Sequence, residues 1–417
     1  MIGHRMNRLS IEKDALECLP SGGLRYHIDP AFKYALLMVS AMRVSLSLIA
    51  AMALYQFPLY HVTYYHGVPP VPPGIADLLL GVWQRFDTIW YTKIAMQGYA
   101  KGDGTTVFFP LYPLLTRFVG YVTSGNHLLA GIIVSNLACF LALVYLYKLT
   151  ELEFDSRVAL HTLIYLSLFP TAFFLLGAYT ESPFLLFAVS AFYYARKGKW
   201  LPASIMGLLA ALTKQLGLFL LPPLLYEYLA GRGFRLRSIR WDALFLLLIP
   251  LGTLAFLLFR HFYIGEPLSV AETYRTQWAV QAAWPWENIF DSLMAILDTE
   301  RFPPLNPEDT FSRRFFYNSL DLACVGLFVF FSFASLRRLR LSYNLYMFSV
   351  LFVVLLQDFR PPYPIAALPR YVLVMFPAFM LLASKVRNRA LRWVTWYFSA
   401  MLLSLFTAMF ATWRIVA

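Results

Sequence analysis

The sequence has 417 residues, of which 59% are hydrophobic and 14% are charged, whereas soluble domains carry about 25% charged residues. Apolar residues recur along the chain in windows of about 15–25 residues, which excludes a soluble globular protein, a disordered chain and a receptor with a single anchor. The net charge of +12 could indicate a nucleic acid, anionic lipid headgroups or a phosphorylated substrate, so its distribution has to be examined first.

The N-terminal residues 1–38 are predicted to form a cytoplasmic segment. They contain basic residues but no apolar core long enough for a cleavable signal peptide. Residues 39–417 are predicted to form a single multi-pass transmembrane domain. The alternating pattern of a transmembrane barrel is missing, so the expected fold class is an all-α polytopic membrane protein.

Eleven apolar stretches predict about 11 transmembrane helices. Several of them are short for a bilayer core, which indicates tilted, broken or half-helices. They lie at 39–60, 127–149, 158–178, 182–196, 201–213, 216–230, 243–262, 315–336, 341–357, 371–384 and 391–413.

The segment 107–122 is also apolar, but Pro110, Pro113 and Arg117 interrupt it. We interpret it as re-entrant or interfacial, because four short basic loops then fall on the side of the N-terminus. The positive-inside rule places that side in the cytoplasm and the C-terminus outside. The basicity is therefore mostly an orientation signal, and nucleic-acid binding loses its support. The basic loops are 196–199, 232–240, 337–340 and 385–392.

Two long loops, at about 61–126 and 263–314, lie on the predicted outer side and are rich in aromatic residues. Transporters and channels tend to have short connections and to carry their function near the middle of the membrane. Long outer loops with interfacial helices favour chemistry at that membrane surface.

Asp87 is the first candidate for catalysis. The apolar spacing over 81–100 predicts an amphipathic helix on the outer interface, with Asp87 beside Phe86 and Trp90. Partial desolvation would favour use of this carboxylate as a general base. The alternative is an ordinary interfacial helix with a solvated aspartate. Arg85 and Lys93 could bind a lipid phosphate or could reach the headgroups as anchors.

Three further charged residues lie at predicted outer ends of spans. Glu181 could belong to a site or act as a polar helix cap. Lys214, followed by Gln215, lies between two apolar runs and could neutralise a phosphate, or it could be a lysine in a boundary turn. Arg370 could be a site residue or a boundary anchor. Asp321, near the outer leaflet, could pair with an arginine or bind a substrate hydroxyl.

No metal site is predicted, because His61 and His66 have poor spacing for a shared ligand face and no third ligand is evident. The three cysteines form no CxxC or Cys/His cluster, so neither a disulfide framework nor a zinc site is supported. The remaining pattern is one-sided: a carboxylate and several cations lie beside the aromatic outer loops. This pattern suits an enzyme that takes a lipid-linked phosphate ester as its substrate.

Five segments resemble, in order, those of the phosphatidylinositol-glycan class V (GPI mannosyltransferase II) family, in particular its bacterial relatives in the GT-C superfamily of glycosyltransferases. RFDTIWYTKIAMQGY resembles the first-loop signature and FFPLYPLLTR an FxPLYPLL segment. LFPTAFFLLGAYTESPFLLF resembles the YTES segment, LTKQLGL the RxNG segment and LPRYVLVMFP the PRYxxxxFP segment.

The resemblance implies a GT-C-type fold and an inverting transfer of a sugar, typically mannose, from a polyprenyl-phosphate donor. Asp87 matches the catalytic aspartate. Lys214 and Arg370 would contact the donor phosphate, with Arg85 as a further candidate. We assign substrate binding to the residues in or beside the matching segments: Glu181, Trp90, Tyr91, Tyr112 and Gln215. No cofactor or metal is required.

The sequence departs from the family at Lys214 and Leu216, which replace an arginine and an asparagine, and a lysine lacks the arginine fork. We expect a multi-pass protein of a bacterial cell membrane with an extracytoplasmic active site. Its partners would be the donor, membrane lipids and a lipid, glycan or protein acceptor, but no nucleic acid. The alternatives are a transporter or flippase for a lipid-linked sugar and an inactive relative that serves as a scaffold.

Overall fold

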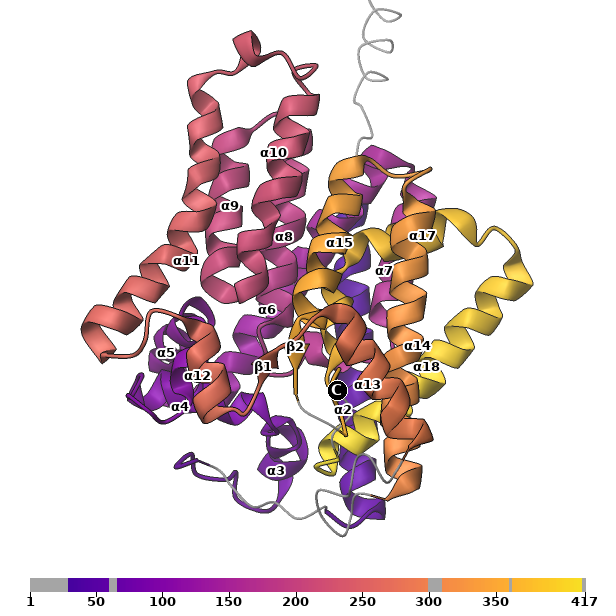
Figure 1. The fold of residues 1–417 in the computed structure, drawn as a ribbon. Coiled ribbons are helices and arrows are strands. Elements are labelled where there is room, and N and C mark those ends of the chain that lie inside the picture. The colour runs from indigo at the N-terminus through magenta and orange to yellow at the C-terminus, as the bar shows by residue number, and fades with distance from the viewer. Residues whose placement is uncertain (1–28, 60–65, 299–309, 360–361, 415–417) are drawn as a thin grey trace, which may run out of the picture.

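The computed structural model describes residues 29–59, 66–298, 310–359 and 362–414. These residues are mostly helical, which confirms the predicted class of secondary structure. Their strands are two short segments, β1 (Gln281–Ala282) and β2 (Gln357–Asp358), which pair in antiparallel orientation. Figure 1 shows α8–α11 side by side above α4, α5 and α12, with α14, α15 and α17 on the other side of the molecule.

Five helical segments among the described residues are long and apolar enough to cross a membrane. A sixth is a pair of helices bent by 76° at Met375, and Arg370 lies in the first of the pair. The five are α2 (Pro30–Gln56), α6 (His127–Glu153), the η6–α11–η7 segment (Trp241–Ile264), α14 (Phe311–Ser335) and α18 (Arg389–Ala411), and the bent pair is Leu368–Val374 with α17 (Phe376–Lys385).

The other predicted passes correspond to shorter helices, so the count of about 11 remains a prediction. A straight helix needs about 20 residues to cross a 30 Å bilayer core. Each of these helices nevertheless coincides with a predicted apolar stretch. They are α7 (Ser156–Ser167), α8 (Glu181–Arg196), α9 (Trp200–Thr213), α10 (Leu221–Ala230) and α15 (Leu341–Leu355).

The predicted boundary at residue 38 falls inside helix α2, which begins at Pro30. The Asp29 carboxylate caps this helix by accepting from the Ala31 N–H at 2.9 Å, and it also pairs with Lys148 at 2.8 Å. Hydropathy alone misses this start, because the first turns of α2 mix apolar and polar residues. The cap and the ion pair determine where the helix begins.

The two long loops contain short helices and contact each other. The first has α3 (Ile75–Leu79), α4 (Asp87–Gln97), η2 (Thr105–Val107) and α5 (Leu111–Val122), and the second has α12 (Val270–Gln277) and α13 (Pro285–Leu297). The Gly102 N–H donates to Glu266 at 2.7 Å, and the Gly104 N–H donates to Gln277 at 2.8 Å. The Trp278 indole N–H donates to the Gly104 carbonyl at 3.0 Å, so the loops form one layer.

In segment 107–122 the helix α5 begins only at Leu111, after Pro110. One face of α5 is buried, whereas Leu114, Phe118 and Tyr121 on its other face are exposed. Its 12 residues reach only about 18 Å at 1.5 Å per residue, too short to cross a bilayer. The helix therefore has the length and the two faces expected of an interfacial segment.

A network of ion pairs connects four helices at the opposite end from the long loops. Arg196 contacts Glu153 at 2.5 Å and Glu227 at 3.2 Å. Arg340 contacts Glu227 at 3.3 Å and Glu153 at 3.6 Å. These contacts bring the ends of α6, α8 and α10 to the start of α15. They place basic turns from distant parts of the sequence at one end of the bundle, as the topology prediction requires.

Gly217 lets η4 (Gln215–Leu220) fold back against α9. A Cβ atom at this position would overlap the backbone of Ala210 and Ala211, which belong to the last turn of α9. Backbone atoms cannot move aside as the end of a flexible side chain can. The close approach therefore requires glycine and determines how the chain continues after Lys214.

We expect Gly217→Ala to destabilise the protein by about 3 kcal/mol, because overpacking a close backbone contact forces the chain to shift. The measurement is the melting temperature of the purified protein in detergent. Gly326→Ala is the matched control, because a Cβ at Gly326 in α14 meets open space. That variant should melt at or slightly above the wild-type temperature. Equal melting temperatures of the two variants would contradict the requirement for glycine at position 217.

Candidate active site

Asp87 is the first residue of helix α4. The prediction of one continuous helix over 81–100 is wrong, because the short helix η1 (Gly81–Trp83) ends before Asp87 and Phe86 has a φ of 50°. A bulky residue enters this left-handed region at a cost of about 1–3 kcal/mol, and such strain concentrates at functional sites. The break places the Asp87 carboxylate at the amino end of α4, where unpaired N–H groups favour negative charge.

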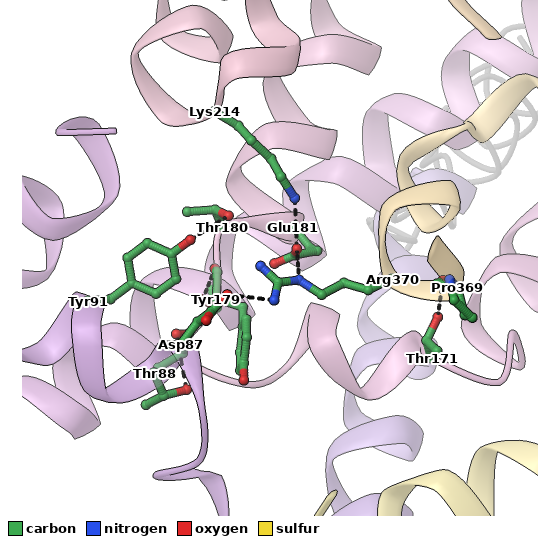
Figure 2. A network of polar contacts seen from close by, with 12 residues as sticks. Asp87, Thr88, Tyr91, Thr171, Tyr179, Thr180, Glu181, Lys214, Pro369 and Arg370 are labelled. Carbon is green, nitrogen blue, oxygen red and sulfur yellow. Dashed lines mark hydrogen bonds and ion pairs between the residues drawn. The ribbon is translucent and has the colours of Figure 1, made fainter. Parts of the chain in front are cut away.

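Four predicted site residues form a chain of alternating charge (Figure 2). The Asp87 Oδ2 atom accepts from the Arg370 guanidinium at 2.6 Å. The Nε atom of Arg370 donates to Glu181 Oε1 at 2.6 Å, and the Lys214 ammonium donates to the same oxygen at 2.8 Å. Two carboxylates and two cations therefore meet from four segments that are far apart in the sequence.

Glu181 is fully buried at the start of α8, where it binds both cations through one carboxylate oxygen. It does not act as a helix cap, because Thr180 occupies the N-cap position and the Glu181 oxygen faces Lys214 and Arg370. A buried carboxylate costs several kcal/mol unless it is paired. Its second oxygen, Oε2, is buried without a hydrogen-bond partner in the described part of the chain, and Glu181 does not line the neighbouring cavity.

Lys214 and Arg370 lie against aromatic rings. The Lys214 ammonium is 4.7 Å from the centre of the Tyr371 ring, and the Arg370 guanidinium is 5.0 Å from that of Tyr179. Lys214 has an extended backbone at the break between α9 and η4, as the pattern of two short apolar runs predicts. Contacts between cations and rings stabilise partly desolvated charges and hold both side chains at the cavity.

A positive backbone angle and two contacts position the turn that carries Arg370. Helix α16 (Leu368–Tyr371) follows Ala367, which has a φ of 68°. The Thr171 hydroxyl donates to the Pro369 carbonyl at 2.7 Å, as Figure 2 shows. The Leu368 backbone hydrogen-bonds to the buried Asp321 carboxylate. Asp321 thus supports the backbone of this turn, a role outside the two alternatives considered from the sequence.

A cavity of about 80 Å³ adjoins the chain of charges. Its size suits a small polar group, so a larger ligand requires the surrounding loops to move. Of the predicted site residues, Asp87, Tyr91, Lys214, Gln215 and Arg370 line it. The structure adds four polar residues that the sequence reasoning did not select as site residues: Thr213, Tyr274, Gln357 and Tyr371.

Two tyrosines of the long loops, Tyr91 and Tyr274, are hydrogen-bonding groups and not bases. Burial raises the pKa of the Tyr91 phenol well above its ordinary value, and the Asp87 carboxylate raises it further. Burial also raises the pKa of Tyr274, together with the neighbouring Tyr371 and Asp87. Both phenols therefore keep their protons at neutral pH and can donate to a ligand. The Tyr91 hydroxyl lies 3.2 Å from that of Thr180.

Trp90 and Tyr112 pack near the cavity but do not line it. Trp90 stacks on Phe108 with ring centres 5.9 Å apart and also contacts Trp278 at 5.1 Å. The Tyr112 hydroxyl is buried and donates to the Gly131 carbonyl at 3.0 Å, while its ring packs edge-on against Tyr91. These residues support the cavity wall in this structure, and their assignment to substrate binding stays a prediction.

Arg85 contacts backbone carbonyls that lie outside the chain of alternating charge. Its buried guanidinium donates to the carbonyls of Ala411 at 2.9 Å, Gly81 at 2.6 Å and Gln84 at 3.2 Å. Arg85 does not line the cavity, and its assignment to the donor phosphate stays a prediction.

The described part of the chain holds no group of three His, Cys, Asp or Glu residues that could bind a metal ion. His66 packs on Trp90 with ring centres 4.1 Å apart, and His61 lies outside the described residues. Cys139 and Cys324 are free thiols, whereas Cys18 also lies outside that range.

A family model described as dolichyl-phosphate-mannose-protein mannosyltransferase matches residues 108–263. The matched region is less than half of the chain, and it contains Glu181 and Lys214 but not Asp87 or Arg370. No curated protein matches the chain.

Solved structures with a similar arrangement include ArnT from Cupriavidus metallidurans bound to undecaprenyl phosphate. It has 16% identity and a TM-score of 0.48, with 86% of this chain and 62% of that chain covered. The oligosaccharyltransferase AglB from Archaeoglobus fulgidus, in complex with an inhibitory peptide and a dolichol-phosphate, has 12% identity and a TM-score of 0.40. That match covers 90% of this chain and 56% of AglB. The chain thus spans less than two thirds of the length of either structure.

Proposed function

We propose that this protein is an integral membrane glycosyltransferase that moves a sugar from a polyprenyl-phosphate donor to a hydroxyl acceptor. The observation that carries the proposal is the chain of alternating charge beside a cavity. One carboxylate at its end, Asp87, is partly exposed, and two cations lie where a phosphate can reach them. The match to the dolichyl-phosphate-mannose-protein mannosyltransferase model over residues 108–263 supports the same reaction class.

In the proposed reaction, Asp87 accepts the proton of the acceptor hydroxyl as the oxygen attacks the anomeric carbon. The bond between that carbon and the phosphate oxygen breaks, and the polyprenyl phosphate leaves with the electron pair. Lys214 and Arg370 stabilise the negative charge on the leaving phosphate. Attack opposite to the leaving group inverts the anomeric centre. The chemistry uses only side chains of this chain.

The pairing of Asp87 with Arg370 relates donor binding to the activity of the base. While Arg370 lies 2.6 Å from Asp87, its guanidinium occupies one oxygen of the carboxylate. A donor phosphate competes for the same guanidinium. When Arg370 turns toward the phosphate, the Asp87 carboxylate is released to the acceptor.

The finer parts of the proposal rest on the family resemblance of the five sequence segments. We take mannose as the sugar, a lipid or glycan as the acceptor, and phosphatidylinositol-glycan class V enzymes as the nearest functional type. The distribution of basic loops supports a cytoplasmic N-terminus and an extracytoplasmic active site in a cell membrane.

The test measures sugar transfer by the purified protein in lipid nanodiscs. The protein is supplied with radiolabelled polyprenyl-phosphate mannose and a membrane-lipid extract. Parallel reactions with other polyprenyl-phosphate sugars test the choice of mannose. Label in a new product supports the proposal and identifies the acceptor. Movement of intact donor between leaflets of proteoliposomes, without transfer of any sugar, would support a flippase instead.

We expect Lys214→Ala and Arg370→Ala each to raise the donor concentration for half-maximal rate by about ten-fold or more. A hydrogen bond to a charged group contributes about 1.5–3 kcal/mol, and each variant loses one such contact to the phosphate. Initial rates over a range of donor concentrations measure the effect. Lys101→Ala is the matched control, because Lys101 is an exposed cation of the first loop outside the cavity lining. An unchanged donor dependence in both variants would remove the phosphate assignment.

A further inference from the structure

A second cavity, of about 680 Å³, lies at the end of the bundle where α7, α17 and α18 begin or end. The cavity is separate from the candidate active site and shares no lining residue with it. Its charged lining is strongly basic and consists of Arg157, Arg338, Lys385, Arg387 and Arg392, with Asp155 as the carboxylate.

The five cations come from four parts of the fold. Arg157 lies in the first turn of α7, and Arg338 follows the end of α14. Lys385 ends α17, Arg387 lies in the turn after it, and Arg392 lies in the first turns of α18. An orientation signal requires only that basic residues lie on one side of the membrane. It does not require that cations from four segments converge on one cavity.

Within the described residues, no carboxylate forms an ion pair with the cations of this cavity. Asp155 is engaged elsewhere, since it caps α7 by accepting from the Val158 N–H at 2.7 Å. Like charges gathered around a cavity repel one another, and an anion within it removes that repulsion.

The neighbouring ion-pair network provides an internal comparison. Arg196 and Arg340 lie at the same end of the bundle, and both are paired with Glu153 and Glu227. The fold thus neutralises arginines that serve only as connections between helices. Among the described residues the cations of the second cavity have no such partners, so an external anion could neutralise them.

We propose that this cavity binds a phosphate group, presented by the headgroup of an anionic lipid or by a soluble phosphorylated compound. Arginine forks match phosphate oxygens in pairs, and basic pockets between membrane helices bind phosphate headgroups. Helix α18 continues from the cavity with an exposed apolar face that includes Trp393, Val394 and Phe398, next to which acyl chains can lie.

The test measures binding to the purified full-length protein by native mass spectrometry. Detergent micelles contain equal amounts of phosphatidylcholine and phosphatidylglycerol, and a second series contains phosphatidylcholine with inorganic phosphate or pyrophosphate. The variants are Arg338→Gln/Arg387→Gln and, independently, Lys385→Gln/Arg387→Gln, all at exposed positions. The matched control, Arg235→Gln/Arg237→Gln, removes the same charge from exposed arginines of the basic loop outside this cavity.

We expect the wild type and the control to bind phosphatidylglycerol more strongly than phosphatidylcholine. Both cavity variants should bind phosphatidylglycerol at least ten-fold more weakly than the wild type does. The same loss for inorganic phosphate or pyrophosphate, without selection of phosphatidylglycerol, would support the site and assign it to a soluble compound. Two results would overturn the proposal: no selectivity of the wild type for any phosphate ligand, or an equal loss in the control. The readout is binding, so it does not depend on glycosyltransferase activity.

Discussion

Asp87→Asn is expected to reduce sugar transfer by about 10³-fold or more while the protein still folds and binds the donor. General-base catalysis contributes about 10²–10⁴-fold, and an asparagine amide cannot accept the proton. The substitution keeps the shape of the side chain at the amino end of α4. Arg370 keeps its contact with Glu181 at 2.6 Å, so the remaining pairs of the chain stay in place. Single-turnover rates at saturating donor measure the effect.

Asp103→Asn is the matched control for this experiment, because Asp103 is an ionised carboxylate in the same loop outside the cavity lining. Burial works to raise the pKa of Asp103, but hydrogen bonds from Thr105 and Lys93 outweigh it and lower the pKa overall. We expect this control to keep a rate within a few-fold of the wild type. Full transfer by Asp87→Asn would end the assignment of Asp87 as the base.

Glu181→Gln is expected to destabilise the protein by about 3–5 kcal/mol, because the change leaves two buried cations without their shared counterion. Glu181 is fully buried and holds Lys214 at 2.8 Å and Arg370 at 2.6 Å. The amide is nearly the same size, so the effect reports charge and not packing. The measurement is the melting temperature in detergent, together with donor binding, which should weaken as Lys214 and Arg370 lose their positions.

A double variant tests why Glu181→Gln loses stability. In Glu181→Gln/Lys214→Met one cation is removed together with the carboxylate, so the double variant should melt at a higher temperature than Glu181→Gln alone. Glu272→Gln, at an exposed position of α12, serves as the matched control and should melt within about 0.5 kcal/mol of the wild type. A wild-type melting temperature for Glu181→Gln would refute the counterion role.

The sequence predicts the helical fold well, because long apolar runs are strong signals of buried or membrane-embedded helices. It predicts helix ends poorly where they depend on a single backbone angle. The start of α4 depends on Phe86 and that of α16 on Ala367, and both residues have positive φ although neither is glycine. No local composition signal marks such residues, so the helix over 81–100 is predicted as continuous.

The sequence identified candidate site residues but not their contacts. An aspartate beside aromatic residues in a predicted interfacial helix identified Asp87, and charges at the ends of apolar spans identified Glu181, Lys214 and Arg370. Their pairing joins positions that are 283 and 189 residues apart in the sequence, and only the packed fold brings them together. Gln357 was missed because it belongs to β2 of the short β1–β2 pairing, which has no hydrophobic periodicity to reveal it.

The length of helix α8 has a consequence for the depth of the site. Its 16 residues run from Glu181 to Arg196 and span about 24 Å, less than the roughly 30 Å thickness of a bilayer core. Any tilt shortens that reach further. With Arg196 level with one headgroup layer, Glu181 lies several Å beneath the other. We therefore expect a donor phosphate in the proposed reaction to lie below the membrane surface, where Lys214 and Arg370 replace the water around it.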